Sequence, residues 1–367
     1  MQNLNFLNNL EAENNILGLI ETLKNTSKPI ICFPAGTVAK GIHNTLQRYG
    51  VTISLFGDNN VSKIGTSIYG KDVVSFSQIT KEYSDAYILV SSKLYKDEII
   101  TQFKAAGFDD SQLIFKIFSY FELITTSSFY KEMTTQENNL NTLINLLSDE
   151  FSRETLLTKL QFMYDFDSSN LEKVVSKNTM YFDEDIIKIK DDEVFVDGGS
   201  FTGDTFEAFL EKTKNWSHYY AFEPDSDNFI TLNENVSLYN NVTAIQKGLW
   251  SNSDTLYFNS QDGGSSIVSD TSNCTTSIDV VSIDEYFKEM AVSFIKLDVE
   301  GSERETLEGA VETIKKHKPI LAVCIYHKPM DIIELPLFMH SLCPDSKMYI
   351  RHYGIDGTDT VCYLIPN

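Results

Sequence analysis

Short runs of apolar residues recur along the chain, and most are followed by a polar turn and then by a stretch with helical spacing. A short apolar run is typical of a strand buried in a parallel sheet, whereas apolar residues three and four positions apart indicate one face of a helix. In the first third of the chain this pattern predicts strands over Pro29–Phe33, Val51–Phe56, Tyr87–Ser91 and Gln112–Phe118, and helices over Lys40–Tyr49 and Glu98–Ala106.

The same alternation returns in the second half. It predicts strands over Val194–Val196, His218–Phe222, Val242–Gln246, Phe294–Leu297 and Ile320–Ile325, a closing pair over Met348–Arg351 and Val361–Ile365, and an added hairpin from Thr255–Asn259 and Asp279–Ser282. Strands that alternate with helices form parallel sheets. We therefore expect an α/β protein with two tandem Rossmann-like domains: an N-terminal domain over 1–125, a polar, partly helical linker over 126–180, and a second domain over 181–367.

A glycine-rich turn stands at the centre of the second domain. Asp197 ends the apolar run, Gly198, Gly199 and Gly203 follow, and a helix is predicted from Asp204. Glycine tolerates positive φ and lets a ligand approach the backbone. The spacing differs from the dinucleotide pattern Gly-x-Gly-x-x-Gly, and no lysine follows as in a P-loop. An acid at the strand tip suits a ligand with an amino group, such as S-adenosylmethionine; the alternative is an ordinary strand–turn–helix.

The next two predicted strands end in residues suited to a nucleoside. Glu223 and Pro224 follow the second strand, and Glu223 lies about twenty residues after Gly203, where a carboxylate would accept hydrogen bonds from two ribose hydroxyls. Gly248, Leu249 and Trp250 follow the third strand. Leu249 or Trp250 would cover an adenine ring. The alternative for Glu223 is an exposed acid at a strand end, and the alternative for Trp250 is a tryptophan in the core.

Three acids gather where the fourth strand ends. Asp298, Glu300 and Glu303 repel one another unless they accept hydrogen bonds or bind a cation. His327 ends the fifth strand, which should lie beside the fourth, and histidine is the side chain whose ordinary pKa lies nearest neutrality. The Ser-, Gly- and Thr-rich loop Gln261–Ser277 would form a substrate lid at the same edge.

The N-terminal domain has a weaker version of the nucleotide pattern. Pro34 and Ala39 stand at the first and third glycine positions of Gly-x-Gly-x-x-Gly, and Asp58 lies where an acid would meet a ribose. Pro34 removes a backbone donor that a pyrophosphate would need. We therefore expect this domain to bind no dinucleotide tightly and to position a substrate or a partner. The run Val51–Val74 resembles the small Rossmann-like domains attached to glycan-biosynthesis enzymes.

Composition narrows the possible partners. With 52 acidic and 30 basic residues the net charge is −22, which argues against nucleic acid and anionic membranes because both require clustered Lys and Arg. The five dispersed cysteines predict reduced thiols and a cytoplasmic protein. The acidic, Asn-rich start predicts no signal peptide, and no apolar run is long enough for a membrane span.

Three stretches in order resemble the FkbM family of S-adenosylmethionine-dependent methyltransferases. They are Val196-Asp197-Gly198-Gly199-x-x-x-Gly203, Phe222-Glu223-Pro224 and Ile295-Lys296-Leu297-Asp298-Val299-Glu300-Gly301-x-Glu303. Tyr326-His327-Lys328-Pro329-x-Asp331 and Arg351-His352-Tyr353 look like a branch met in cell-surface glycan clusters. The resemblance covers about residues 180–367 and leaves the N-terminal half outside. It implies a class I methyltransferase fold with a mostly parallel seven-stranded sheet.

The resemblance also implies O-methylation of a hydroxyl on a sugar, glycan precursor or polyketide. The expected cofactor-binding residues are Asp197, Gly198, Gly199, Ser200, Gly203, Asp204, Thr205, Glu223, Pro224, Gly248, Leu249, Trp250 and Asp298. A sugar hydroxyl is a poor nucleophile and needs a general base, for which His327 and Asp298 are the candidates. Each has an alternative role, His327 as a structural histidine and Asp298 in orienting the cofactor. Asp298, Glu300 and Glu303 would instead hold Mg²⁺ in a metal-assisted reaction.

Two other functions stay open from the sequence. The first is a degenerate methyltransferase fold that serves as a binding subunit of a glycan-assembly system. Its N-terminal domain would then hold a second copy of the chain or an assembly partner. The second is an oxidoreductase or sugar-nucleotide enzyme that uses the N-terminal fold, against which the altered loop at Pro34 argues.

Overall fold

The computed structural model describes residues 15–92, 95–115, 133, 135–165, 168–259, 266–267, 276–354 and 357–367. These residues form two compact units, one of residues 1–136 with 157–171 and the other of residues 137–156 with 172–367. We call them the N-terminal and the C-terminal unit. Most of the predicted lid, Gln261–Ser277, lies outside the described residues.

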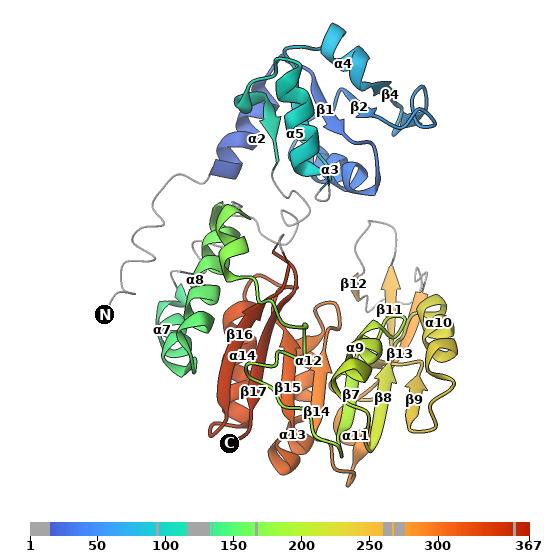
Figure 1. Ribbon diagram of the computed structural model, residues 1–367, viewed down its shortest axis with the longest axis vertical. Coiled ribbons are helices and arrows are strands. Elements are labelled where there is room, and N and C mark those ends of the chain that lie inside the picture. Colours follow the sequence, from blue (N-terminus) through green and yellow to red (C-terminus); the bar gives the residue numbers. More distant parts are fainter. Residues whose placement is uncertain are drawn as a thin grey trace. The chain divides into compact units, whose positions relative to one another are not determined.

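The N-terminal unit is built around a six-stranded sheet (Figure 1). Its elements are α2 (Asn15–Asn25), β1 (Ile30–Phe33), α3 (Thr37–Arg48), β2 (Leu55–Asp58), β3 (Ser67–Ile68), β4 (Lys71–Ser75), α4 (Phe76–Glu82), β5 (Tyr87–Val90), α5 (Lys96–Ala105) and β6 (Leu113–Ile114). The strand order is β3-β4-β2-β1-β5-β6, and every pair is parallel except β3 with β4. Strand β2 begins at Leu55, later than the predicted Val51, since the ladder with β1 starts only there.

The C-terminal unit holds a seven-stranded sheet in the order β16-β17-β15-β14-β7-β8-β9. Its sheet strands are β7 (Val194–Gly198), β8 (His218–Phe222), β9 (Val242–Ile245), β14 (Phe294–Leu297), β15 (Ile320–Cys324), β16 (Lys347–His352) and β17 (Thr360–Ile365). Its helices are α7 (Glu137–Leu146), α9 (Asp204–Lys212), α10 (Ser226–Val236), α11 (Ile283–Phe287), α12 (Glu303–Glu308), α13 (Val311–His317) and α14 (Asp331–Leu342), and helix α8 (Glu150–Asp165) continues from this unit into the other.

Strand β17 is antiparallel to both of its neighbours, β15 and β16, and all the other pairs in this sheet are parallel. The predicted α/β class, the two Rossmann-like units and the mostly parallel seven-stranded sheet are confirmed. Strand order reverses between β7 and β14, and ligands of open α/β sheets bind beyond the carboxyl ends of the strands at such a switch point.

Aromatic side chains build the core on one face of this sheet. Phe195 pairs in register with Tyr219 on one side and Phe294 on the other, so the three rings lie next to one another. The Phe195 ring stacks 4.7 Å from Tyr219 and 4.5 Å from Phe294, measured between ring centroids. Phe206 and Phe209 of α9 cover them. This layer fixes the strands whose ends carry the predicted site residues.

A second, four-stranded sheet projects from the carboxyl edge. It has the order β10-β13-β11-β12, with β10 (Gly248–Leu249), β11 (Asp254–Asn259), β12 (Ser266–Ile267) and β13 (Thr276–Val281). The predicted hairpin is the antiparallel pair β11–β13. Residues 137–156, which the sequence assigns to the linker, belong to the C-terminal unit: Arg351 forms an ion pair of 2.6 Å with Asp149, and Ser148 donates its N–H to Met348.

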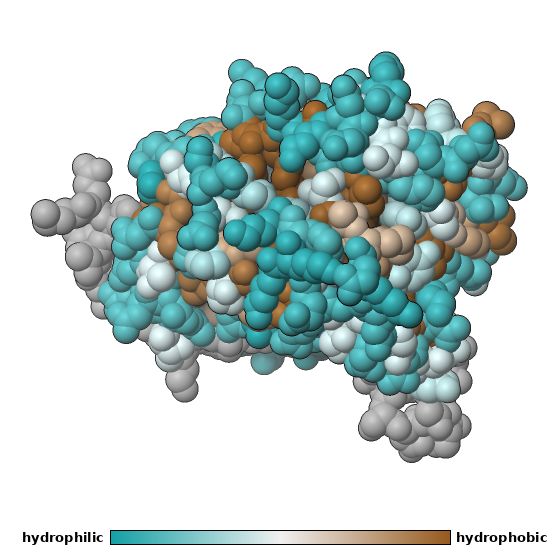
Figure 2. Space-filling model, turned by 90° about the horizontal axis from the view of Figure 1, so that it is seen from below, coloured by the Kyte–Doolittle hydropathy of each residue, from teal (hydrophilic) through white to brown (hydrophobic). Residues whose placement is uncertain are grey.

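The surface offers no membrane-spanning element among the described residues, because none of their helices is both long and apolar enough. Figure 2 shows hydrophilic residues over most of the face seen from below, with apolar residues in separate groups.

Candidate functional site

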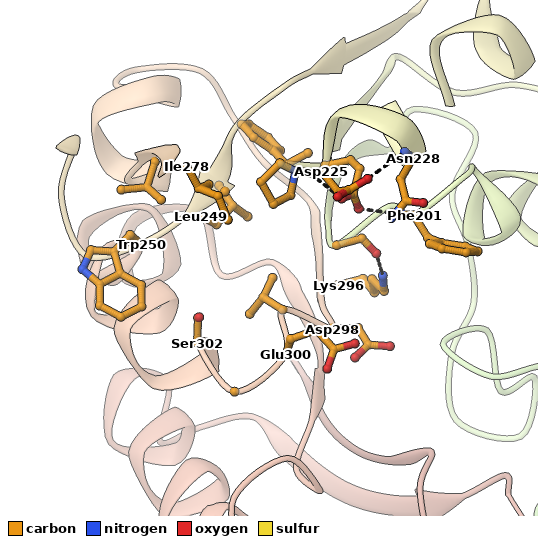
Figure 3. Close-up of a pocket in the computed structure, with 18 of the residues that line it drawn as sticks. Phe201, Asp225, Asn228, Leu249, Trp250, Ile278, Lys296, Asp298, Glu300 and Ser302 are labelled. Carbon is orange, nitrogen blue, oxygen red and sulfur yellow. Dashed lines mark hydrogen bonds between the residues drawn. The ribbon is translucent and has the colours of Figure 1, made fainter. Parts of the chain in front are cut away.

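A cavity of about 810 Å³ opens at the carboxyl edge of the seven-stranded sheet. Its walls come from the turns after β7, β8 and β14 and from the small sheet formed by β10, β11 and β13. Apolar Leu249, Trp250 and Ile278 lie together at one end (left in Figure 3), away from Lys296 and Asp298. The cavity therefore has one apolar end and one polar end.

The glycine turn is held tightly against the turn after β14. Gly199 has a φ of +76°, and a Cβ at this position would lie 1.8 Å from the carbonyl oxygen of Asp298. The amides of Gly199 and Ser200 both donate to the carbonyl of Phe222, each at 3.0 Å. Glycine is thus required by the protein's own backbone, and a larger residue would displace the turn after β14 as well as any ligand.

Asp197 is fully buried beneath this turn. Its Oδ1 lies 2.9 Å from the Nζ of Lys296, and its Oδ2 accepts a hydrogen bond of 2.8 Å from the Tyr219 hydroxyl. Lys296 is the direct neighbour of Asp197 in the β7–β14 ladder, which explains the pairing. The structure therefore places Asp197 as the counter-ion of Lys296 and outside the cavity wall.

Glu223 lines the cavity just after β8. Its two carboxylate oxygens accept backbone N–H bonds from Phe201 and Asp225, each 2.9 Å long (Figure 3). The Asn228 side chain also hydrogen-bonds to this carboxylate, so three donors fix it. Burial raises the pKa of Glu223, and the bonds from the two amides and from Asn228 only partly oppose that shift.

Phe201 marks the mouth of the cavity. It has a left-handed φ of +47°, the residue is 54% exposed, and its amide donates to Oε2 of Glu223. A non-glycine residue in this conformation costs of order 1–3 kcal/mol and commonly marks a functional site.

Asp298 faces the polar end with three polar neighbours. Its Oδ2 accepts a bond of 2.8 Å from Tyr181, and its Oδ1 accepts one of 3.2 Å from Tyr326. The Nε2 of His327 lies 3.4 Å from Oδ1. Asp298 lines the cavity, whereas His327 is not among the residues of its wall. His327 thus stands behind Asp298.

Carboxylates surround the His327 ring. Its Nδ1 lies 2.9 Å from Oε1 of the buried Glu303, and its Nε2 lies 3.6 Å from the exposed Glu300. Burial alone would lower the pKa of His327, but the bond to Glu303 and the charges of Glu303, Asp298 and Glu300 outweigh it, so the pKa is raised. His327 therefore keeps its proton to a higher pH than an ordinary histidine.

The sequence offers Asp298, Glu300 and Glu303 as ligands for Mg²⁺, whereas the structure groups a different set of three residues. Asp298, Glu303 and His327 bring candidate ligand atoms within 4.8 Å of one another. However, Oε1 of Glu303 already accepts the Val299 N–H at 3.0 Å and faces His327, and imidazole is a poor ligand for Mg²⁺. The donor set does not support Mg²⁺.

The predicted site residues divide into two groups. Lining the cavity are Gly199, Asp204, Thr205, Glu223, Pro224, Gly248, Leu249, Trp250 and Asp298; outside its wall are Asp197, Gly198, Ser200, Gly203 and His327. Sequence reasoning missed Tyr181, Phe201 and Lys296, which also line it. Only Lys296 carried a signal, as a charge inside the apolar strand Phe294–Leu297.

Comparison with known proteins agrees with this geometry. Residues 197–354 match the family model of the methyltransferase FkbM domain. No curated protein matches the chain. Among solved structures, methyltransferase FkbM from Methylobacillus flagellatus KT aligns over 98% of this chain and 97% of its own, with 23% identity and a TM-score of 0.77, so both units share its fold.

Smaller methyltransferases align over part of the chain. An rRNA methylase from Streptococcus thermophilus matches 49% of this chain and 89% of its own, with 18% identity and a TM-score of 0.32. Fibrillarin from Aeropyrum pernix, solved with natively bound S-adenosyl-L-methionine, matches 49% of this chain and 69% of its own, with 10% identity and a TM-score of 0.32. The family model and the cavity at its three motifs lead to one conclusion: the C-terminal unit carries a methyltransferase domain of the FkbM family.

Proposed function

We propose that the protein is an S-adenosylmethionine-dependent O-methyltransferase that acts on a hydroxyl of a sugar or a cell-surface glycan precursor. The observation that carries the proposal is Glu223, a carboxylate fixed by two backbone amides in the wall of the cavity, between the glycine turn and an apolar end. The cavity of about 810 Å³ is of the size that accommodates a cofactor together with part of an acceptor.

The cofactor would lie along the cavity from the polar to the apolar end. Gly199, Asp204 and Thr205 would surround its amino-acid end, where the first turn of α9 also offers free backbone N–H groups to the carboxylate. Glu223 would accept bonds from the ribose hydroxyls. Leu249 and Trp250 would cover the adenine. When bound, the cofactor supplies an electrophilic methyl group.

The acceptor hydroxyl would lie against Asp298, the carboxylate at the polar end. A sugar hydroxyl must lose its proton as the new C–O bond forms. The Asp298–His327 pair would take that proton, which requires His327 to be neutral beforehand. Tyr181 and Tyr326 hold the Asp298 carboxylate in place with their hydroxyls. The protein's main contribution would be alignment and exclusion of water.

The N-terminal unit would have a supporting role, positioning a substrate or a partner such as a second copy of the chain. Its candidate ribose-binding acid, Asp58, is occupied by an ion pair of 2.8 Å with Lys63 and by the amide of Asn60. An acid in this state is poorly available to a ribose.

A degenerate binding subunit is the alternative, and one observation favours it: the Asp298 carboxylate is already bonded to two phenols and faces His327. Titration calorimetry of the full chain with S-adenosylmethionine, S-adenosylhomocysteine, NAD and a UDP-sugar tests cofactor binding. Methyl transfer from labelled S-adenosylmethionine to a glycan extract then separates enzyme from subunit. We expect micromolar binding of the two adenosyl ligands only, and labelled glycan. Tight NAD binding or an unlabelled extract would contradict the enzyme proposal.

A further inference from the structure

Lys296 is a buried cation in the cavity wall. Its side chain is 2% exposed, and it projects from β14 beneath the glycine turn. A lysine at such a position must be paired and hydrogen-bonded, because an isolated buried ammonium group is strongly disfavoured.

The Lys296 ammonium group lies close to three oxygen atoms of the protein. Nζ lies 2.9 Å from Oδ1 of Asp197, 2.7 Å from the carbonyl oxygen of Gly199 and 3.2 Å from that of Gly198 (Figure 3 shows one of these bonds). The amine therefore ties β14 to two consecutive peptide groups of the turn. Those peptides lie at the polar end of the cavity, where the glycine turn approaches the turn after β14.

The same bonds remove Asp197 from ligand recognition. One of its oxygens faces Lys296, the other accepts the Tyr219 hydroxyl, and the residue is 0% exposed. An amino group of a ligand would have to displace a buried ion pair to reach it. What the acid provides is the charge that keeps Lys296 protonated in the interior.

We propose that Lys296 is a positioning residue that holds the Gly198 and Gly199 peptides in the shape that receives the amino-acid end of the cofactor, with Asp197 as its counter-charge. This inference rests on the proposed function, since it assumes that an S-adenosyl ligand occupies the cavity. It predicts that losing Lys296 weakens binding of the amino-acid end of the ligand. Binding of the nucleoside end, which Glu223 and Leu249 would hold, should be unaffected.

A single substitution would be a poor test, because Lys296→Met leaves the Asp197 carboxylate buried and unpaired, and such a change is strongly destabilising. The variant Asp197→Asn/Lys296→Met removes both charges together and keeps an acceptor for Tyr219. Replacing a whole buried pair is often nearly neutral for stability. Asp197→Asn/Lys296→Gln is a second neutral pair, to be used if the first does not fold.

The experiment measures two ligands on the full chain by calorimetry, with thermal unfolding of each protein recorded alongside. S-adenosylhomocysteine carries the amino-acid end, and 5′-methylthioadenosine lacks it. We expect the neutral pair to bind S-adenosylhomocysteine about tenfold or more weakly, the effect of losing charge-assisted bonds, and methylthioadenosine within about twofold of the unaltered protein. The matched control is Lys212→Met/Glu184→Gln, an ion pair of 2.8 Å away from the cavity wall, which should change neither affinity.

Equal weakening of both ligands would overturn the inference, because it would mean that Lys296 supports the fold in general. Unchanged binding of both would overturn it too, by showing that the turn keeps its shape without the lysine. If the unaltered protein binds neither ligand, the proposed function itself fails, and the role of Lys296 fails with it.

Discussion

The two units each place an acid at a strand tip after a glycine-containing loop, but only one of the two acids is available to a ligand. In the N-terminal unit, Asp58 ends β2 and is bound to Lys63. In the C-terminal unit, Glu223 follows β8, is held by two backbone amides, and has no ion pair among the described residues. Both acids are more than nine-tenths buried. Burial and position thus do not distinguish a ligand-binding acid from a structural one. What distinguishes them is whether a cationic side chain is paired with the carboxylate.

The two loops also differ in whether they require a glycine. Gly36 has an extended backbone with a φ of −158°, and a Cβ would meet nothing within 4 Å. Gly199 needs both positive φ and the missing Cβ. The N-terminal loop is therefore a turn that most residues could form, whereas the C-terminal one is a close approach of two backbones.

The largest expected effect is at Asp298, in the turn after β14. Asp298→Asn should lower the rate of methyl transfer by about 10³–10⁴ and weaken cofactor binding, because the carboxylate lines the cavity and would accept the proton. Transfer of label from S-adenosylmethionine to the glycan extract measures the rate. A rate within threefold or so of the parent protein would remove Asp298 from the chemistry.

Exchanging the two glycines for alanine tests the contrast between the loops directly. Gly199→Ala should lower the free energy of unfolding of the C-terminal unit by about 3 kcal/mol, through backbone strain and the contact with the Asp298 carbonyl. Gly36→Ala should change that of the N-terminal unit by less than about 0.5 kcal/mol. Scanning calorimetry can follow both units, and equal shifts for the two variants would show that the loops do not differ.

His327 should affect the rate by about 10², and in a pH-dependent way. Glu303 and its acidic neighbours raise the pKa of His327 against the opposing effect of burial, so the ring is protonated, and unable to take a proton, up to a pH above the ordinary 6.5. The rate should therefore rise with pH through this raised pKa, and His327→Asn should lose that dependence while keeping affinity for S-adenosylhomocysteine. An unchanged profile in the variant would leave His327 a structural role.

The sequence anticipated those parts of the site that depend on local pattern. The helix after the glycine turn runs over Asp204–Lys212 as expected, and the three motifs meet at one edge because the carboxyl ends of parallel strands do so. It could not anticipate which partner a buried acid takes. Asp197 pairs with Lys296 through a strand register, and Tyr181 reaches Asp298 from a segment 117 positions earlier. Such contacts depend on tertiary packing, which no short-range spacing encodes.

The smallest effect is expected from neutralising Glu223 and Asp58 in turn, which tests the comparison of the two units directly. Glu223→Gln should weaken S-adenosylhomocysteine binding by about tenfold, because a neutral amide oxygen accepts a hydroxyl proton less strongly than a carboxylate. Asp58→Asn should leave this affinity unchanged and lower stability by about 1 kcal/mol at most, because its partner Lys63 is 44% exposed and can turn to water.

Calorimetry with S-adenosylhomocysteine and NAD on the two full-length variants decides between the acids. A ligand loss confined to Glu223→Gln, with thermal unfolding close to that of the parent protein, assigns recognition to the acid that has no lysine partner. Weaker binding in Asp58→Asn would mean that the Lys63 pair opens for a nucleotide and that the N-terminal unit binds one after all. Asp58 ends the second strand of its unit and Glu223 follows the second strand of the other. That result would therefore mean that the Asp58–Lys63 ion pair opens reversibly, and that the two units differ only in how readily their acids accept a ligand.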